Sequence, residues 1–298
     1  RMKLSLGPIE VSVNRKTENP TEQKLGTKAL DTLNDAVLNQ MSHLTEAAWQ
    51  ARLASVSLPA LETEKDYQKA SKILQDHGIV IVQSFLRPAN IEGAVAKIGS
   101  WLDQVSQKID QGESYEDDRI AVQIGVGKLT SYEALATYSK PVATVRAGAD
   151  QGMIDIFNVD GLVGDHRDDL RTPFSNPWLL KLLADYHEGL SPQNLNLYLN
   201  RSITKTRGFH VDNFERNLKG FVYLSDVAFL SDGPYCYVKG TNKPSVWQAA
   251  NKKVSELFAA PTEAPFVNFE SILPVLAKAG SLILSDQSGV HRGIPQAQ

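Results

Sequence analysis

The sequence predicts an α+β protein in which a largely helical N-terminal half packs against a C-terminal antiparallel β-barrel or sandwich. Two observations predict this class. Apolar residues recur at helical spacing in several segments before about residue 110. After Asn194 the chain changes to short strand-like runs separated by Gly, Pro, Asp and Asn. We expect the 298 residues to behave as one domain, with mainly helical support and early strands in 1–190 and the barrel core in 191–298.

Three helices are predicted in the N-terminal half. The first covers residues 25–53 and is broken near His43, and the second covers 64–75. The wholly apolar run Ile79–Val82 then predicts a buried strand. A third helix is expected to begin after Pro88, because apolar side chains follow it at a spacing of three and four residues. These apolar positions are Ile91, Val95, Ile98, Leu102, Val105 and Ile109.

The rest of the chain is predicted to be richer in strands. Residues 110–169 are expected to form loops with short strands, for example at 120–124 and 153–157. A helix is expected over 176–188, because Pro177 suits an early helical position. A further helix at 245–258 is expected to interrupt the strands of the C-terminal half. Those strand-like runs are Asn194–Asn200, Gly208–Asp212, Gly220–Asp226, Tyr235–Lys239 and Ser281–Asp286.

Composition and charge exclude several classes of protein. The net charge of −3 gives no electrostatic reason to expect nucleic acid or an anionic membrane as a partner. The single cysteine, Cys236, excludes an internal disulfide and a CxxC metal or redox site. Apolar runs such as Ile79–Val82 are too short to cross a bilayer, and no signal-peptide pattern opens the chain. A soluble, cytoplasmic protein is therefore expected, and its oligomeric state is left open.

Three residues of the C-terminal half form a candidate metal site. His210 and Asp212 lie two positions apart, so on a strand their side chains share one face while Val211 points the other way. His291, just after the strand-like run Ser281–Asp286, offers a third ligand. Two histidines and one carboxylate with open positions form the facial triad of non-haem Fe(II) oxygenases. The pattern therefore predicts a site that binds iron and leaves room for a cosubstrate and O2.

Six blocks of sequence occur in an order and spacing that resemble the phytanoyl-CoA dioxygenase family. The residues Gly78–Val82 also resemble the entry strand of that family, so the resemblance spans about Gly78 to Pro295. The six blocks are Gly208-Phe209-His210-Val211-Asp212-Asn213, Val222-Tyr223-Leu224-Ser225-Asp226, Asp232-Gly233-Pro234, Lys239-Gly240-Thr241-Asn242-Lys243, Gly280-Ser281-Leu282-Ile283-Leu284-Ser285-Asp286 and His291-Arg292-Gly293.

The resemblance implies a fold and an activity. It implies a double-stranded β-helix, the jelly-roll or cupin-like barrel, with N-terminal helices packed against it. It also implies His210, Asp212 and His291 as catalytic ligands of Fe(II), with 2-oxoglutarate as cosubstrate. The expected reaction is hydroxylation of a C–H bond in a small-molecule substrate by O2, with succinate and CO2 as coproducts. Halogenating relatives lack the carboxylate ligand, so the presence of Asp212 disfavours halogenation.

One expected residue is absent from the sequence. The family places an arginine several residues after the distal histidine, where it holds the distal carboxylate of 2-oxoglutarate. Only Arg292 follows His291, and on a strand it points to the opposite face. We expect either that the chain continues beyond Gln298 or that the protein uses another cosubstrate. Two alternatives therefore stay open: a metal-dependent cupin-type enzyme that does not use 2-oxoglutarate, and a non-catalytic jelly-roll binding protein.

Candidate cosubstrate contacts come from alternation in the run Asn194–Asn200. Asn196, Tyr198 and Asn200 share one face of this strand-like run, and three leucines share the other. Polar side chains that face a barrel interior need partners. Asn196, Tyr198 and Asn200 are therefore candidates to line the cosubstrate pocket, and the alternative is a solvated outer face.

Overall fold

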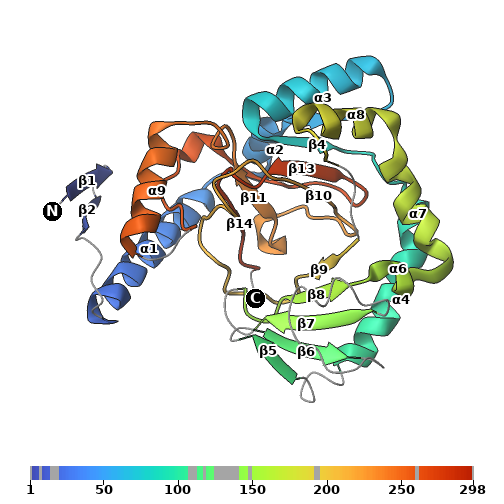
Figure 1. The fold of residues 1–298 in the computed structure, drawn as a ribbon, viewed down its shortest axis with the longest axis horizontal. Helices are drawn as coiled ribbons and strands as arrows, with labels where there is room; N and C mark the ends of the chain where they lie inside the picture. Colours follow the sequence, from blue (N-terminus) through green and yellow to red (C-terminus); the bar gives the residue numbers. More distant parts are fainter. Residues whose placement is uncertain are drawn as a thin grey trace.

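In the computed structural model, the protein combines helices with largely antiparallel sheets (Figure 1). The structure describes residues 2–6, 9–13, 20–106, 113–116, 119–123, 141–146, 150–190, 195–258 and 262–296.

Six of the eight described helices lie where they were predicted, whereas α6 and α7 were not predicted and begin in the segment expected to form loops with short strands. The break predicted near His43 separates α1 from α2, and α3 ends where Gly78 adopts a left-handed conformation with φ of 74°. Thr63 and Asp66 form a capping box at the start of α3, which explains where this helix begins. The helices are α1 (Pro20–Met41), α2 (Glu46–Ala54), α3 (Glu64–His77), α4 (Pro88–Ser106), α6 (Val159–Val163), α7 (Arg167–Arg171), α8 (Pro177–Tyr186) and α9 (Val246–Phe258).

The described strands form four sheets. Their orders are β1-β2, β5-β6-β7-β8-β9, β10-β13-β4-β3 and β12-β11-β14. All the strand pairs are antiparallel except β3 and β4. The strands are β1 (Met2–Leu6), β2 (Ile9–Val13), β3 (Ser57–Leu58), β4 (Ile79–Val82), β5 (Glu113–Glu116), β6 (Arg119–Gln123), β7 (Val142–Arg146), β8 (Ile154–Phe157), β9 (Leu197–Leu199), β10 (Leu218–Val222), β11 (Tyr235–Val238), β12 (Ile272–Pro274), β13 (Leu282–Asp286) and β14 (His291–Gly293).

Several strand predictions need correction. The run Gly208–Asp212 is extended chain rather than a strand, because only His210 makes β-bridges there. The run predicted at Gly220–Asp226 begins earlier, at Leu218, and ends at Val222. In the middle of the chain, the strands predicted at 120–124 and 153–157 correspond to β6 and β8, whereas β5 and β7 of the same five-stranded sheet were not predicted. Strands β12 and β14 have three residues each and are too short to show alternation in the sequence. Ile109, Ile124 and Asn194 lie outside the described residues.

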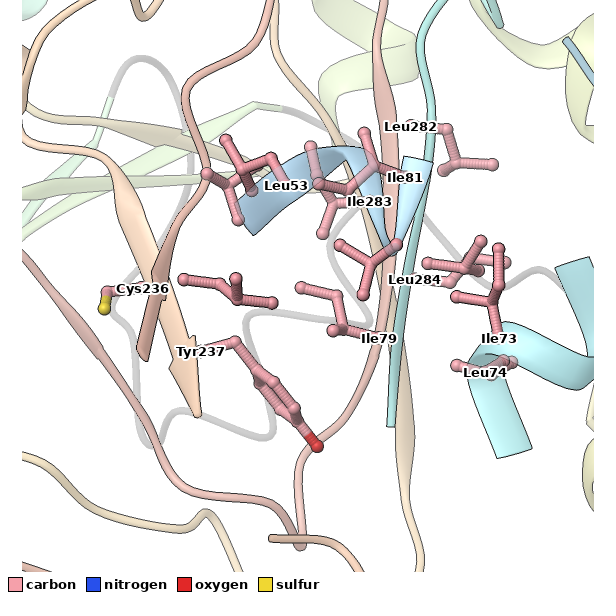
Figure 2. Close-up of a cluster of buried hydrophobic side chains, with 14 of the residues drawn as sticks. Leu53, Ile73, Leu74, Ile79, Ile81, Cys236, Tyr237, Leu282, Ile283 and Leu284 are labelled. Carbon is pink, nitrogen blue, oxygen red and sulfur yellow. The ribbon is translucent and has the colours of Figure 1, made fainter. Parts of the chain in front are cut away.

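The main core lies between two of the sheets. Strand β4 is buried at all four positions because it lies between β3 and β13 in its sheet, with further layers on both faces. Figure 2 shows Ile79, Ile81 and Ile283 pointing toward Tyr237 of β11, whereas Leu284 points toward α3. Burial of one such side chain contributes roughly 1.5–3 kcal/mol, so this cluster fixes the two sheets face to face.

The helices cover the outside of this core. Figure 1 shows α3 and α8 side by side above the sheet that contains β4 and β13, while α4 lies beside the five-stranded sheet. A second apolar cluster joins α4 to that sheet and includes Ile98, Ile156 and Leu170. Among the described residues, no helix has the length and apolar character that a bilayer crossing needs.

Gly289 provides a test of how tightly the turn after β13 is packed. A Cβ at this position would collide with the Tyr237 hydroxyl, which donates a hydrogen bond to the carbonyl of Asp286. We expect Gly289→Ala to lower the free energy of unfolding by about 1–3 kcal/mol, as overpacking does. Urea denaturation followed by circular dichroism measures the change.

Gly99 is the matched control. It lies within α4, and a Cβ there would meet no atom within 4 Å. Gly99→Ala should therefore leave stability unchanged or raise it by roughly 0.5–1 kcal/mol. Equal stability of wild-type protein and the Gly289→Ala variant would contradict the packing described for this turn.

Candidate metal centre

Three residues from two segments that are distant in the sequence converge beside the main core. One ligand atom from each of His210, Asp212 and His291 lies within 4.8 Å of the other two. The Asp212 Oδ1 atom is 3.5 Å from Nε2 of His291 and 3.9 Å from Nε2 of His210. The two imidazole rings are tilted by 55° with their centroids 4.5 Å apart. The structure therefore brings together the three residues that the sequence singled out.

Backbone hydrogen bonds place the two histidines directly opposite each other. The His210 amide donates to the His291 carbonyl at 3.0 Å, and the His291 amide donates to the His210 carbonyl at 2.8 Å. Residues that exchange both bonds in an antiparallel pair direct their side chains to the same face. Strand β14 in turn pairs with β11, which aligns His291 with Tyr237. The metal-ligand candidates are thus held by the sheet itself.

A third backbone contact places the carboxylate. The Asp212 amide donates to the Gln287 carbonyl at 3.0 Å, and Gln287 directly follows β13. The Val211 amide donates instead to the Thr262 carbonyl, on the other side of the same segment. Successive backbone amides from His210 to Asp212 therefore point to alternate sides, as in a strand, although only His210 forms β-bridges.

Both imidazoles present the same nitrogen to Asp212. Nδ1 of His210 lies 2.8 Å from the Gly208 carbonyl, and Nδ1 of His291 lies 2.9 Å from the Gly289 carbonyl. Because a carbonyl oxygen only accepts, each Nδ1 carries the proton and donates it. Nε2 is then the nitrogen that faces the carboxylate on each ring. A backbone acceptor on the far nitrogen is the usual support of a metal-ligating histidine.

Burial and charge set the protonation of the site. Burial, together with the nearby His291 and Arg207, holds the pKa of His210 well below its usual value. Burial alone would raise the pKa of Asp212, but its contact with His291 and the positive charge of Lys219 lower it to about 2. Near neutral pH His210 is therefore neutral and Asp212 is ionised, the states in which both groups bind a metal ion.

A buried carboxylate supports the turn that leads to His291. Asp286 is fully buried at the end of β13 and accepts from the Tyr186 hydroxyl at 2.7 Å and from Ser288 Oγ at 2.7 Å. The amides of Ser288 and Asn217 also donate to it. Burial, followed by the bond to Asp286, raises the pKa of Tyr186, so its hydroxyl stays protonated as the donor. This network fixes the backbone just before His291.

The proposed cosubstrate contacts lie on β9 or beside it. Asn196, Tyr198 and Asn200 are exposed, while the alternating leucines pack into the cluster that includes α4. The Tyr198 ring lies 5.2 Å from Nζ of Lys219, whose charge acts on Asp212. The Asn200 carbonyl accepts a bond from Gln296. The predicted alternation of faces is thus present, and the roles of Asn196, Tyr198 and Asn200 toward a cosubstrate stay predictions.

Arg292 points away from the triad, as expected for the residue after His291. Its guanidinium lies 5.2 Å from the centre of the Phe209 ring and donates to Thr206 Oγ1 at 3.0 Å. Phe209 directly precedes His210, so Arg292 packs on the opposite side of the same pair of segments. Arg292 therefore does not take the place of the arginine expected several residues after His291.

Four polar residues near the site were not foreseen from the sequence. Lys219 of β10 lies opposite Ser285 of β13 in the strand register. Ser285 Oγ is 3.1 Å from the Tyr235 hydroxyl and accepts from the side-chain Nε2 of Gln287 at 2.8 Å. The Tyr235 ring lies 5.7 Å from that of His291. Neither β10 nor β13 shows a regular alternation of apolar and polar residues, and a strand pattern does not identify the partner strands.

Comparisons with known proteins give weak likenesses only. No family model matches the chain, and no curated protein matches it. The epimerase SnoN in complex with Fe3+, alpha ketoglutarate and nogalamycin RO is 15% identical, with 79% of this chain and 80% of that chain covered and a TM-score of 0.42. EvdO2 from Micromonospora carbonacea var. aurantiaca, complexed with 2-oxoglutarate, is 12% identical over 80% of this chain and 87% of that chain, with a TM-score of 0.42.

HygX from Streptomyces hygroscopicus with nickel and 2-oxoglutarate bound is 11% identical, with 76% of this chain and 80% of that chain covered and a TM-score of 0.31. Identities and TM-scores this low do not assign an activity to the chain. The function has to be inferred from the residues of the site.

Removal of the Tyr186 hydroxyl tests the network around Asp286. We expect Tyr186→Phe to lower the free energy of unfolding by roughly 1–3 kcal/mol, because a buried carboxylate loses a donor. Tyr67→Phe is the control, since the Tyr67 hydroxyl also bonds a carboxylate, that of Asp185, but at an exposed position. It should cost less than about 1 kcal/mol. Thermal and urea unfolding compare the two, and an equal loss in both variants would be evidence against a stabilising role for the buried network.

Proposed function

We propose that this chain is a non-haem Fe(II)- and 2-oxoglutarate-dependent oxygenase that hydroxylates a C–H bond of a small-molecule substrate. The observation that carries this proposal is the convergence of His210, Asp212 and His291, with both Nε2 atoms directed at one carboxylate. Two imidazoles and one carboxylate on one side leave the other coordination positions of a divalent ion for ligands. Each Nδ1 donates its proton to a backbone carbonyl, which leaves Nε2 free to bind a metal ion, and the ionised Asp212 offers a negative charge.

The residues of the chain have separate roles in this proposal. His210 and His291 bind Fe(II) through Nε2, and Asp212 binds it through a carboxylate oxygen. Bound Fe(II) with 2-oxoglutarate and O2 supplies the oxidation that yields succinate, CO2 and a hydroxylated product. The backbone carbonyls of Gly208 and Gly289 keep both rings oriented, and the sheet excludes water from the buried side of the site.

The proposed fold is a jelly-roll barrel within a single domain, as in the phytanoyl-CoA dioxygenase family. Two observations support it. The sheet of β12, β11 and β14 packs on the sheet of β10, β13, β4 and β3 through residues such as Phe221 and Tyr235, whose ring centroids are 4.8 Å apart. The triad lies at the edge of this sandwich, where His210 joins β14.

Anaerobic titration of the purified protein tests the function. Fe(II) is added first and 2-oxoglutarate second, and the visible spectrum is recorded after each addition. Chelation of Fe(II) by the 2-oxo acid produces a charge-transfer band, which we expect for the wild-type protein. Consumption of O2 together with formation of succinate is then measured on the loaded protein.

Asp212→Ala is the critical variant. We expect it to weaken Fe(II) binding by more than the roughly 10–100-fold that loss of an outer-shell partner costs, and to abolish succinate formation coupled to product. Asp103→Ala is the control, since Asp103 is an exposed carboxylate on α4. An Asp212→Ala variant that still consumes 2-oxoglutarate at the wild-type rate would show that this site is not the catalytic centre.

The same titration separates the alternatives. Fe(II) binding without the band after 2-oxoglutarate is added favours a metal-dependent cupin-type enzyme with another cosubstrate. A protein that binds neither Fe(II) nor 2-oxoglutarate favours a non-catalytic jelly-roll binding protein.

A further inference from the structure

Lys219 lies where two sheets approach each other beside the candidate metal centre. It belongs to β10, an outer strand of its sheet, and its Nζ lies 5.2 Å from the ring of Tyr198 on β9, an outer strand of the five-stranded sheet. In the register of β10 and β13, Lys219 is opposite Ser285. Directly opposed residues share a face, and Ser285 shares the face of Ile283, which points toward β11. The Lys219 side chain is therefore directed to the side of the sheet that carries the triad.

The surroundings of Lys219 are polar and close to Asp212. Lys219 lies close enough to Asp212 for its positive charge to act on that carboxylate. Ser285 belongs to a hydrogen-bonded trio with Tyr235 and Gln287, and the carbonyl of Gln287 accepts from the Asp212 amide. Gln287 is 1% exposed, and among the described residues no donor reaches its Oε1 atom. The residues beside Lys219 are thus polar, but Oε1 only accepts hydrogen bonds, so it is the Lys219 ammonium group that can bind a carboxylate here.

Lys219 forms no direct ion pair with a carboxylate of the described residues. Within the described part of the chain, no Asp or Glu lies within ion-pair distance of its Nζ. Nearby cations differ in this respect. Arg146 is paired with Asp155 and Asp150, and Arg207 is paired with Glu263. A part-buried cation that lacks an anionic partner is suited to bind the anionic group of a ligand.

We propose that Lys219, supported by the ring of Tyr198, binds the distal carboxylate of the 2-oxo acid cosubstrate, in place of the arginine expected after His291. The assignment rests on the proposed function, because it takes Fe(II) chelated by His210, Asp212 and His291 as the site of the 2-oxo group. It gives Tyr198 a defined role, in which its ring face orients the ammonium group through a cation–π contact. The cosubstrate is then a dicarboxylate rather than a monocarboxylic 2-oxo acid.

A comparison of two cosubstrates tests this assignment. Anaerobic Fe(II)-loaded protein is titrated with 2-oxoglutarate and, separately, with 2-oxobutyrate, which has the same chelating head but no distal carboxylate. For Lys219→Met we expect 2-oxoglutarate to bind roughly 10–100-fold more weakly, as loss of a bond to a charged group predicts. The affinity for 2-oxobutyrate should not change, because that ligand has no group for Lys219 to bind.

Three controls accompany the test. Lys219→Arg keeps the positive charge and should keep most of the affinity for 2-oxoglutarate. Lys72→Met removes an exposed lysine of α3 that pairs with Asp76, and it should change neither affinity. The Fe(II) affinity and urea unfolding of each variant show that metal loading and folding are preserved before the cosubstrates are compared.

The outcomes distinguish the assignment from the function on which it rests. The assignment is wrong if wild-type protein binds 2-oxoglutarate and Lys219→Met binds it equally well. It is also wrong if Lys219→Met weakens both cosubstrates by the same factor, since Lys219 would then act through Asp212 or the metal. If the wild-type Fe(II) protein binds neither cosubstrate, the proposed function itself fails, and the Lys219 assignment fails with it.

Discussion

The candidate site depends on a single antiparallel pair, in which His210 and His291 exchange both of their backbone hydrogen bonds. This pair brings together segments that are far apart in the sequence, and it directs both rings to one face. The Asp212 amide adds a third bond, to the Gln287 carbonyl, so backbone hydrogen bonds alone hold the three residues together. Side chains held in this way lose little conformational freedom when they bind a ligand.

The core makes this pair rigid. Tyr237 lies opposite His291 in the sheet, and its side chain is buried against β4 and donates to the Asp286 carbonyl. Asp286, buried and bonded by Tyr186, supports the turn before β14. The apolar cluster and the polar network therefore meet at one short turn, and the distance between the two imidazoles depends on both.

Local patterns predicted much of this arrangement. The longer helices, the buried strand β4 and the shared face of His210 and Asp212 follow from spacing alone, because each involves neighbours along the chain. The five-residue helices α6 and α7 are too short to show a helical period and were not predicted. The partners of each strand did not follow. Two examples are the pairing of β14 with β11 and the position of Lys219 opposite Ser285. Both depend on contacts between distant segments, which produce no repeating pattern of residues in the sequence. Tyr198 was identified by alternation, yet the lysine beside its ring was not.

The three groups of the triad differ in their access to water. The side chains of His210 and His291 are 11% and 6% exposed, whereas that of Asp212 is 41% exposed. An ion held by these groups rests on two sheltered nitrogens and is reached from solvent along the carboxylate. We therefore expect a chelator to reach an ion held by these groups from the side of Asp212, because that carboxylate is the most exposed of the three.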